Sequence, residues 1–456
     1  MRGYLPFPKN RLLIREMKRE IREYNTYLHS GLVQKICTNR RIQQMGTIIE
    51  EAREERIAPA VMAAAEREEL DPYDLIQNIA QGRTTVMVGK KRAVGIGKGF
   101  TTKVNVNIGT STVRSDLAAE LRKAAVAGRY GADTLTDLSM GGGIREIRSA
   151  ILRETALPLT TVPIYQAVVD AGGIDCLSAD DLIDTFRAHA AEGVSSCVLH
   201  MTDQKTLSAL GRSQRILGVV SKGGSMTAAY MLHTGRENPF LEYFDEVVEI
   251  ARRHEIVISL GNTMRGGSIV DGGDAAATVE RKQNIEIAGR CHEHGVQVII
   301  EGCGGHVRID RIPFCVQLYK DACPYPLFVA GPLATDRAVG HDQIAGAIGA
   351  SIAVSAGADY LCAITPAEHI GLPTEEEVVE GLIAFKIAAH IGDTVRIGSD
   401  YLDAELSACR AELDWKGQIG KAIDPDGLST RIPDEGPCSM CGEYCAIKIM
   451  RESLSR

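Results

Sequence analysis

The sequence predicts an α/β protein built on a (βα)8 barrel, preceded by a small helical region and followed by a helical domain. Short apolar, β-branched runs alternate with long helical segments between about Thr101 and Gly392. Strands that are buried on both faces and followed by helices are typical of parallel sheets. Nine such runs are close to the eight strands of a closed barrel, so one should be peripheral or misassigned; an open doubly wound sheet is the alternative.

The expected elements divide the chain into three parts. We predict an N-terminal helical region at 1–95, a barrel at 96–392 and a C-terminal helical domain at 393–456. In the first part, residues up to about Lys91 read as helical, and Asp71-Pro72 is typical of a helix start. The candidate strands are 103–108, 134–138, 160–164, 194–199, 216–220, 256–260, 296–300, 327–330 and 360–364.

Composition narrows the class of partner. The chain has 51 Lys and Arg against 59 Asp and Glu, which argues against binding to nucleic acids or anionic membranes. No apolar run reaches the length of a membrane span, and the first residues do not resemble a secretory signal. Twelve cysteines in 456 residues are too few for a disulfide scaffold. We therefore expect a cytoplasmic protein that acts on a small molecule.

Polar side chains follow most of the candidate strands. In a barrel the loops after the strands converge on one mouth, where active sites form. A structural barrel would not need a polar group after nearly every strand, so this pattern predicts an enzyme. The residues at these positions are Asn107, Asp137, Tyr165, His200, Ser221, Asn262, Glu301, His306 and His369.

Two of these loops share a pattern of a basic residue, two glycines and a serine. The first is SKGGS at 221–225, with Lys222 and Gly223, and the second is RGGS at 265–268, beginning with Arg265. Glycines let backbone N–H groups approach an anion, while the cation supplies charge. The pattern predicts a phosphate site; ordinary turn chemistry is the alternative.

His306 and His369 follow different strands at the same mouth, and neutral imidazoles are common ligands for divalent metals. Two ligands do not complete a site, and a single histidine is often a hydrogen-bonded core or surface residue, so both interpretations stay open. The CHEH segment at 291–294 precedes its strand. We assign it to a helix surface at the opposite end of the barrel.

Three cysteines near the C-terminus give the strongest chemical signal. Cys438, Cys441 and Cys445 lie within eight residues and can ligate three irons of a [4Fe–4S] cluster. The fourth iron is then free to bind S-adenosylmethionine and generate a 5′-deoxyadenosyl radical. A structural zinc knuckle is the alternative, but it would need a fourth Cys or His nearby.

Eight motifs in order resemble the phosphomethylpyrimidine synthase family of thiamin biosynthesis. The resemblance runs from about Val61 to the C-terminus. It implies a radical S-adenosylmethionine enzyme with a (βα)8 barrel, a C-terminal cluster domain exchanged between the protomers of a homodimer, and 5-aminoimidazole ribonucleotide as substrate. The motifs are VNVNIG, TVPIYQA, VVSKGGS, SLGNTMRGGSI, EGCGGHV, AGPLATD, ITPAEHIGLP and CSMCGEYCAIK.

The resemblance also assigns roles to the residues in these motifs. The three terminal cysteines would bind the cluster, and His306 and His369 a divalent metal, either zinc or iron. Glu301 and Asp137 are candidates for acid–base or hydrogen-bonding roles, and an external donor would supply the electron. The substrate pocket would be lined by Asn107, Tyr165, His200, Ser221, Lys222, Gly223, Asn262, Arg265 and Glu301.

Several pocket positions depart from the family's usual residues, whereas the cluster and metal residues persist. Losing a carboxylate, a guanidinium and a phenol changes which intermediates are held and which protons move. We therefore expect a changed product, 5-hydroxybenzimidazole, a precursor of the cobamide lower ligand; phosphomethylpyrimidine synthase is the alternative. The departures are Thr136, Lys222, Asn262, Gly266, Cys303 and Phe328.

Overall fold

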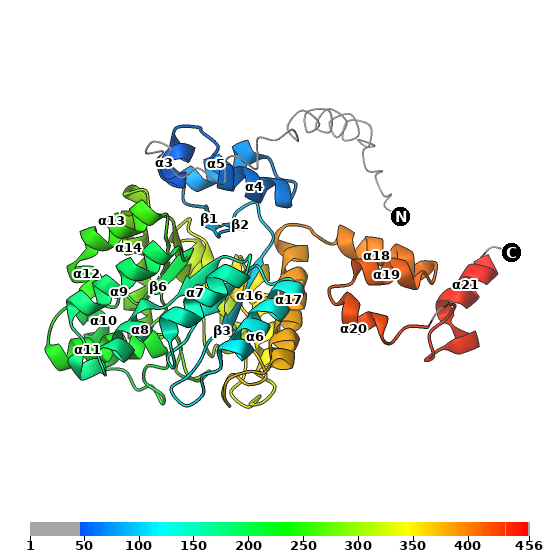
Figure 1. The fold of residues 1–456 in the computed structure, drawn as a ribbon. Coiled ribbons are helices and arrows are strands. Elements are labelled where there is room, and N and C mark those ends of the chain that lie inside the picture. The colour runs from blue at the N-terminus through cyan, green and yellow to red at the C-terminus, as the bar shows by residue number, and fades with distance from the viewer. Residues whose placement is uncertain (1–45, 434, 455–456) are drawn as a thin grey trace. The chain divides into compact units, whose positions relative to one another are not determined.

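The computed structural model describes residues 46–433 and 435–454. Eight parallel strands form a closed barrel, in which β10 pairs with both β9 and β3 (Figure 1). This confirms the predicted (βα)8 architecture. The strands are β3 (Lys103–Ile108), β4 (Thr134–Asp137), β5 (Leu159–Thr161), β6 (Ser196–Leu199), β7 (Val257–Leu260), β8 (Val298–Glu301), β9 (Leu327–Ala330) and β10 (Tyr360–Cys362).

Helices surround the barrel and bury their apolar faces against the strands in one large core. Several begin at side-chain caps, such as Asp274 before α14 and Thr374 before α17, where the expected capping box is present. The barrel helices are α6 (Leu117–Arg129), α7 (Ile144–Glu154), α8 (Pro163–Asp170), α9 (Ala179–Glu192), α10 (Gln204–Leu210), α11 (Lys222–Thr234), α12 (Pro239–Glu242), α13 (Phe244–His254), α14 (Ala275–Glu293), α15 (Ile312–Lys320), α16 (Asp342–Ser355) and α17 (Glu375–Arg396).

The ninth candidate strand, 216–220, is wrong: this segment is a loop between α10 and α11. The backbone N–H groups of Ile216 and Leu217 donate to the Asp271 carboxylate, at 2.8 and 3.1 Å, rather than to a neighbouring strand. Both side chains are also exposed. The apolar run was therefore mistaken for a buried strand, although its large side chains are exposed.

The expectation of helix up to Lys91 is also corrected. Helices α3 (Ile48–Arg53), α4 (Pro59–Arg67) and α5 (Pro72–Ala80) are present, and Asp71 caps α5 as predicted. After them, β1 (Thr84–Val88) and β2 (Ala93–Gly97) form an antiparallel hairpin. The charged opening segment 9–23 lies outside the described residues.

The hairpin closes the end of the barrel at which the strands begin. Met87, Val94 and Ile96 pack against inward side chains of the barrel, including Phe328 and Tyr360. The side-chain amide of Gln297, just before β8, pairs with both backbone groups of Val86, at 2.7 and 3.1 Å. With this end plugged, the opposite end is where a ligand can enter.

The C-terminal region is helical, as expected. It contains α18 (Tyr401–Ala411), α19 (Trp415–Lys421), α20 (Pro425–Ser429) and α21 (Ala446–Leu454). The segment 399–423 is not one continuous helix, because it is divided at Leu413, whose φ is 57°. The Trp415 indole N–H donates to the Gly436 carbonyl at 2.8 Å. Among the described helices, none is long and apolar enough to cross a membrane.

Candidate active site

A cavity of about 470 Å³ opens at the carboxyl ends of the barrel strands. Gly223, on α11, packs closely against His200: a Cβ atom at this position would lie 2.8 Å from His200 Nε2. The structure thus brings together nearly all the residues that the sequence analysis selected. The cavity is lined by Asn107, Tyr165, His200, Ser221, Lys222, Asn262, Arg265, Glu301, His306 and His369, among others.

Asp137 does not reach this cavity. Side chains alternate between the two faces of a strand, so when Thr136 faces the barrel interior its neighbour Asp137 faces outward. The Asp137 carboxylate accepts hydrogen bonds from the backbone and hydroxyl of Ser139, and burial raises its pKa.

Asn107 is fixed by a polar network inside the barrel. The buried Asn105 amide donates to Asn107 Oδ1 at 2.9 Å, and Asn105 Oδ1 accepts from the hydroxyls of Thr134 and Thr136, at 3.0 and 2.9 Å. Each buried polar atom in this network therefore has a partner, which keeps the Asn107 side chain in one orientation at the cavity floor.

The N-terminus of α11 forms one wall of the cavity. Ser221 caps this helix by accepting from the Gly224 N–H at 3.2 Å, and Ser221 Oγ lies 2.8 Å from His200 Nε2. Lys222 Nζ lies 5.3 Å from the centre of the Tyr165 ring. The dipole of the helix and the Lys222 ammonium together favour an anion at this wall.

His200 is held in the neutral form. Burial lowers its pKa to about 3, and the nearby Arg265 guanidinium acts in the same direction. The ring is also tightly enclosed: a Cβ atom at Gly261 would lie 1.9 Å from His200 Nδ1. His200 therefore serves as a neutral hydrogen-bonding group next to the anion wall.

Glu301, the last residue of β8, is the carboxylate at the centre of the cavity wall. It accepts from the Ser259 hydroxyl at 2.8 Å and from the Asn262 N–H at 3.4 Å. Burial raises its pKa, while the Ser259 hydrogen bond and the Arg265 charge oppose that shift. These opposing effects suit a group that gains and loses a proton during turnover.

His306 and His369 lie next to each other in the lining of the cavity, with their Nε2 atoms 3.2 Å apart. His306 Nδ1 lies 2.7 Å from Asp336 Oδ1, and His369 Nδ1 lies 3.2 Å from Asp342 Oδ2. The Asp336 carboxylate accepts a hydrogen bond from His306 and orients that ring, and Asp342 lies beside the other ring, so both Nε2 atoms are left available for a metal. Both aspartates were missed by the sequence analysis, although Asp336 ends the AGPLATD motif.

Two further residues that the sequence analysis missed support the loop after β7. The Glu280 carboxylate, buried on α14, accepts from the Asn262 amide at 2.8 Å and the Met264 N–H at 2.9 Å. Arg215, whose side chain is only 2% exposed, pairs with Asp274 and donates to the Met264 carbonyl. Neither belongs to a motif, so the sequence offered no signal for them.

The terminal cysteines lie on a tightly turned loop. The N–H groups of Cys441 and Gly442 both donate to the Cys438 carbonyl, at 3.2 and 3.0 Å, and Gly442 takes a left-handed conformation, with a φ of 51°. Backbone N–H groups of Cys441 and Met440 lower the pKa of the Cys438 thiol. All three thiols are free of disulfides. Burial and the neighbouring Cys438 raise the pKa of the Cys441 thiol, so the feature that fits a cluster is the spacing of three free thiols on one tight turn.

Neither the cysteines nor the histidines form a finished metal site. Within residues 46–433 and 435–454, no three His, Cys, Asp or Glu side chains are grouped to hold a metal ion. The CHEH segment lies at the opposite end of the barrel, as expected, where His292 Nε2 donates to the Ala80 carbonyl at 3.1 Å.

A closed barrel with a polar cavity at its carboxyl end and a separate cysteine loop defines a barrel enzyme that uses an iron–sulfur cofactor. Residues 47–452 match the model of the Radical SAM ThiC family, and the chain belongs to that family. It is therefore a radical S-adenosylmethionine enzyme, and family membership implies a [4Fe–4S] cluster and S-adenosylmethionine as cofactors.

Relatives match over almost their whole lengths. The phosphomethylpyrimidine synthase of Methanopyrus kandleri is 42% identical over 429 residues, which cover 90% of this chain and 99% of the relative. That of Dehalococcoides mccartyi is 41% identical over 424 residues, covering 90% and 98%. Phosphomethylpyrimidine synthase 2 of Methanosarcina barkeri is 38% identical over 423 residues, covering 90% and 99%.

These relatives contradict the expected 5-hydroxybenzimidazole synthase activity and its place in cobamide biosynthesis. The structure shows where three of the departures lie. Cys303 lines a neighbouring cavity instead of this one, and the Phe328 ring lines this cavity while it stacks on Tyr360, with the ring centres 4.0 Å apart. A third departure, Thr136, is used to hold Asn105.

Proposed function

We propose that this protein is a phosphomethylpyrimidine synthase, which converts 5-aminoimidazole ribonucleotide to hydroxymethylpyrimidine phosphate for thiamin biosynthesis. The observation that carries this proposal is the near full-length match to phosphomethylpyrimidine synthases at about 40% identity. The cavity supports it, because the size of about 470 Å³ and the polar lining suit a small phosphorylated substrate.

The substrate phosphate would bind at the N-terminus of α11. The positive end of the dipole of this helix, the Lys222 ammonium and the neutral His200 ring all lie at that wall of the cavity. Arg265, on the loop after β7, would add a second positive charge. Bound in this way, the ribose would extend toward Glu301 and Asn262 at the centre of the cavity.

Cys438, Cys441 and Cys445 would hold the cluster. When bound, a [4Fe–4S] cluster with S-adenosylmethionine supplies a 5′-deoxyadenosyl radical. An external electron donor and a homodimeric state stay predictions from the family resemblance.

His306 and His369 would hold a divalent metal. Two imidazole nitrogens bound to one tetrahedral zinc at ~2.0–2.1 Å lie about 3.3 Å apart, and the two Nε2 atoms here are 3.2 Å apart. The remaining positions would be open to water or to oxygens of the substrate, so the metal could orient the reacting molecule.

Proton transfer would be the task of Glu301. Its carboxyl lines the cavity, and the Ser259 hydroxyl keeps one oxygen in place while the other faces Asn262. Asp137 is not assigned this role, because its carboxyl is engaged by Ser139 outside the cavity.

The proposal is tested without oxygen on the cluster-loaded chain with S-adenosylmethionine and a reductant. We expect 5-aminoimidazole ribonucleotide to stimulate the formation of 5′-deoxyadenosine. The corresponding nucleoside, which lacks the phosphate, should give a rate at least about tenfold lower. Equal stimulation by both would contradict the phosphate wall, and no stimulation by the ribonucleotide would contradict the substrate.

A further inference from the structure

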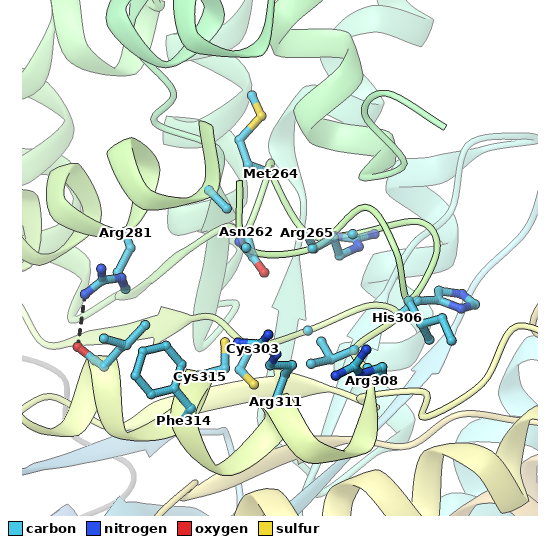
Figure 2. Close-up of a pocket in the computed structure, with 18 of the residues that line it drawn as sticks. Asn262, Met264, Arg265, Arg281, Cys303, His306, Arg308, Arg311, Phe314 and Cys315 are labelled. Atoms are coloured by element: carbon cyan, nitrogen blue, oxygen red, sulfur yellow. Dashed lines mark hydrogen bonds between the residues drawn. The ribbon is translucent and has the colours of Figure 1, made fainter. Parts of the chain in front are cut away.

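A second cavity, of about 740 Å³, lies on the outer side of the loops that follow β7 and β8 (Figure 2). Helices α14 and α15 contribute much of its lining, and its volume is in the range of small-molecule pockets. Four arginines, Arg265, Arg281, Arg308 and Arg311, give it positive charge. Two cysteines, Cys303 and Cys315, also line it, and the proposed reaction uses neither.

The two thiols come from different elements, line the same cavity and interact with each other. Cys303 belongs to the loop after β8, and Cys315 to the first turn of α15; Figure 2 labels both beside Phe314 and Arg311. The Cys303 S–H also reaches the Ile312 carbonyl at 3.7 Å. Cys303 Sγ therefore lies at the first turn of α15, which also carries Cys315, twelve positions further along the chain.

The two cysteines differ in solvent exposure and in the pKa of their thiols. Cys303 is only 5% exposed, whereas Cys315 is partly exposed. The hydrogen bond from the Cys303 S–H group lowers the pKa of Cys315, and the Arg281 charge acts in the same direction. The same hydrogen bond, together with burial, raises the pKa of Cys303. Cys315 is therefore the better nucleophile, and Cys303 the thiol behind it.

We propose that Cys303 and Cys315 form a thiol–disulfide exchange site that reacts with low-molecular-weight disulfides entering this second cavity. The Cys315 thiolate attacks the small disulfide, so a mixed disulfide forms and one small thiolate leaves. Cys303 then loses its proton to solvent and attacks the Cys315 sulfur, which releases the second small thiol. The dithiol loses two electrons and becomes a disulfide, and the small disulfide is reduced to two thiols.

Formation of this disulfide would act on the active site through the β8 loop. Cys303 lies between Glu301 and His306, and its backbone already has a left-handed φ of 52°. The Gly302 and Gly305 N–H groups tie the loop to β9, at 3.0 and 2.9 Å. An S–S bond of ~2.05 Å would draw Cys303 toward α15, and with it the loop that carries both residues.

The test uses the cluster-loaded chain without oxygen, with glutathione disulfide as the probe. We expect mass spectrometry of proteolytic fragments to find a Cys303–Cys315 crosslink that dithiothreitol reverses. Cys315→Ser should abolish reaction at this site, and Cys303→Gly, which suits the left-handed backbone, should stop at a mixed disulfide on Cys315. The matched control, Cys323→Ser near the end of α15, should form the crosslink as the native chain does.

The readout of the crosslink does not depend on the proposed substrate, so the two proposals can fail separately. A stable mixed disulfide at Cys315 in the native chain, or no modification of either cysteine, would overturn the exchange site. In the crosslinked protein we expect 5′-deoxyadenosine formation to fall by about tenfold or more, since small displacements near a reacting centre are costly. An unchanged rate would overturn the coupling to the active site.

Discussion

His306 and His369 point their Nε2 atoms at each other across 3.2 Å, and an aspartate lies behind each ring. Asp336 contacts one ring, and Asp342 the other, so that neither imidazole can turn away without breaking a contact with a carboxylate. The two rings are thus oriented before any ligand arrives. The two histidines should therefore act together as one binding site.

The cluster-loaded chain should bind one divalent ion at this pair. His306→Ala should abolish that binding, and Asp336→Asn should weaken it by about 10–100-fold, because a neutral amide supports the ring less well than a carboxylate. Equilibrium dialysis with Zn²⁺ followed by elemental analysis measures the affinity. His233→Gln, at an exposed position on α11, is the control. An unchanged affinity in Asp336→Asn would contradict the role of the aspartate.

Gly223→Ala should damage the anion wall. A Cβ atom at this position would lie 2.8 Å from His200 Nε2, so either the ring or the first turn of α11 must move. We expect KM for the ribonucleotide to rise about tenfold, which corresponds to about 1.4 kcal/mol. Gly211→Ala is the matched control, because its Cβ would have no neighbour closer than 3.6 Å. Equal KM values in the two variants would contradict the prediction.

Arg215→Ala should destabilise the loop that carries Arg265. The guanidinium donates to Asp274 at 2.8 Å and to backbone carbonyls on both sides, and its loss leaves the carboxylate unpaired. We expect the free energy of unfolding to fall by about 3 kcal/mol, together with a higher KM. Denaturant unfolding and steady-state kinetics measure the two effects. Arg187→Ala removes an exposed ion pair and should cost less than about 1 kcal/mol.

Glu280 should make folding stability depend on pH. Burial raises the pKa of this carboxyl from an ordinary value of 4.5 to about 7. Between these values the folded chain keeps a proton that the unfolded chain has released, so stability falls as the pH rises. Glu280→Gln should flatten this part of the profile. Between about pH 5 and pH 8, the Tm of the variant should therefore rise relative to the native Tm as the pH increases.

The control for this pH effect is Glu249→Gln, at an exposed site on α13. Its Tm should follow the native profile at every pH. A Tm difference between Glu280→Gln and the native chain that stays constant with pH would show that Glu280 does not hold its proton in the folded state.

The barrel was predictable because its eight strands fall in short runs with apolar and β-branched residues, each followed by a helical segment. The hairpin of Thr84–Val88 and Ala93–Gly97 was not predicted. Its apolar side chains pack against the barrel, and no local sequence pattern reveals such a tertiary contact. Segment 216–220 misled for the opposite reason, since its apolar residues are exposed. The division of the chain into three domains stays a prediction.

Within the site, the residues next to the strand ends were found because position alone places them at the mouth of the barrel. The groups that hold them in place were not found, because Glu280 and Arg215 lie on other elements and act through contacts far apart in sequence. The product was assigned wrongly because side-chain departures were read without their surroundings: Cys303 lies outside the cavity, and Thr136 and Phe328 line it while they contact other barrel residues.

The most direct test of the proposed function is the mass of the product. The cluster-loaded chain is incubated without oxygen with 5-aminoimidazole ribonucleotide, S-adenosylmethionine and a reductant, and the products are separated and weighed. We predict a phosphorylated aminopyrimidine, formed together with 5′-deoxyadenosine. A neutral product without phosphate, with the mass of a hydroxybenzimidazole, would contradict the proposal that this protein is a phosphomethylpyrimidine synthase.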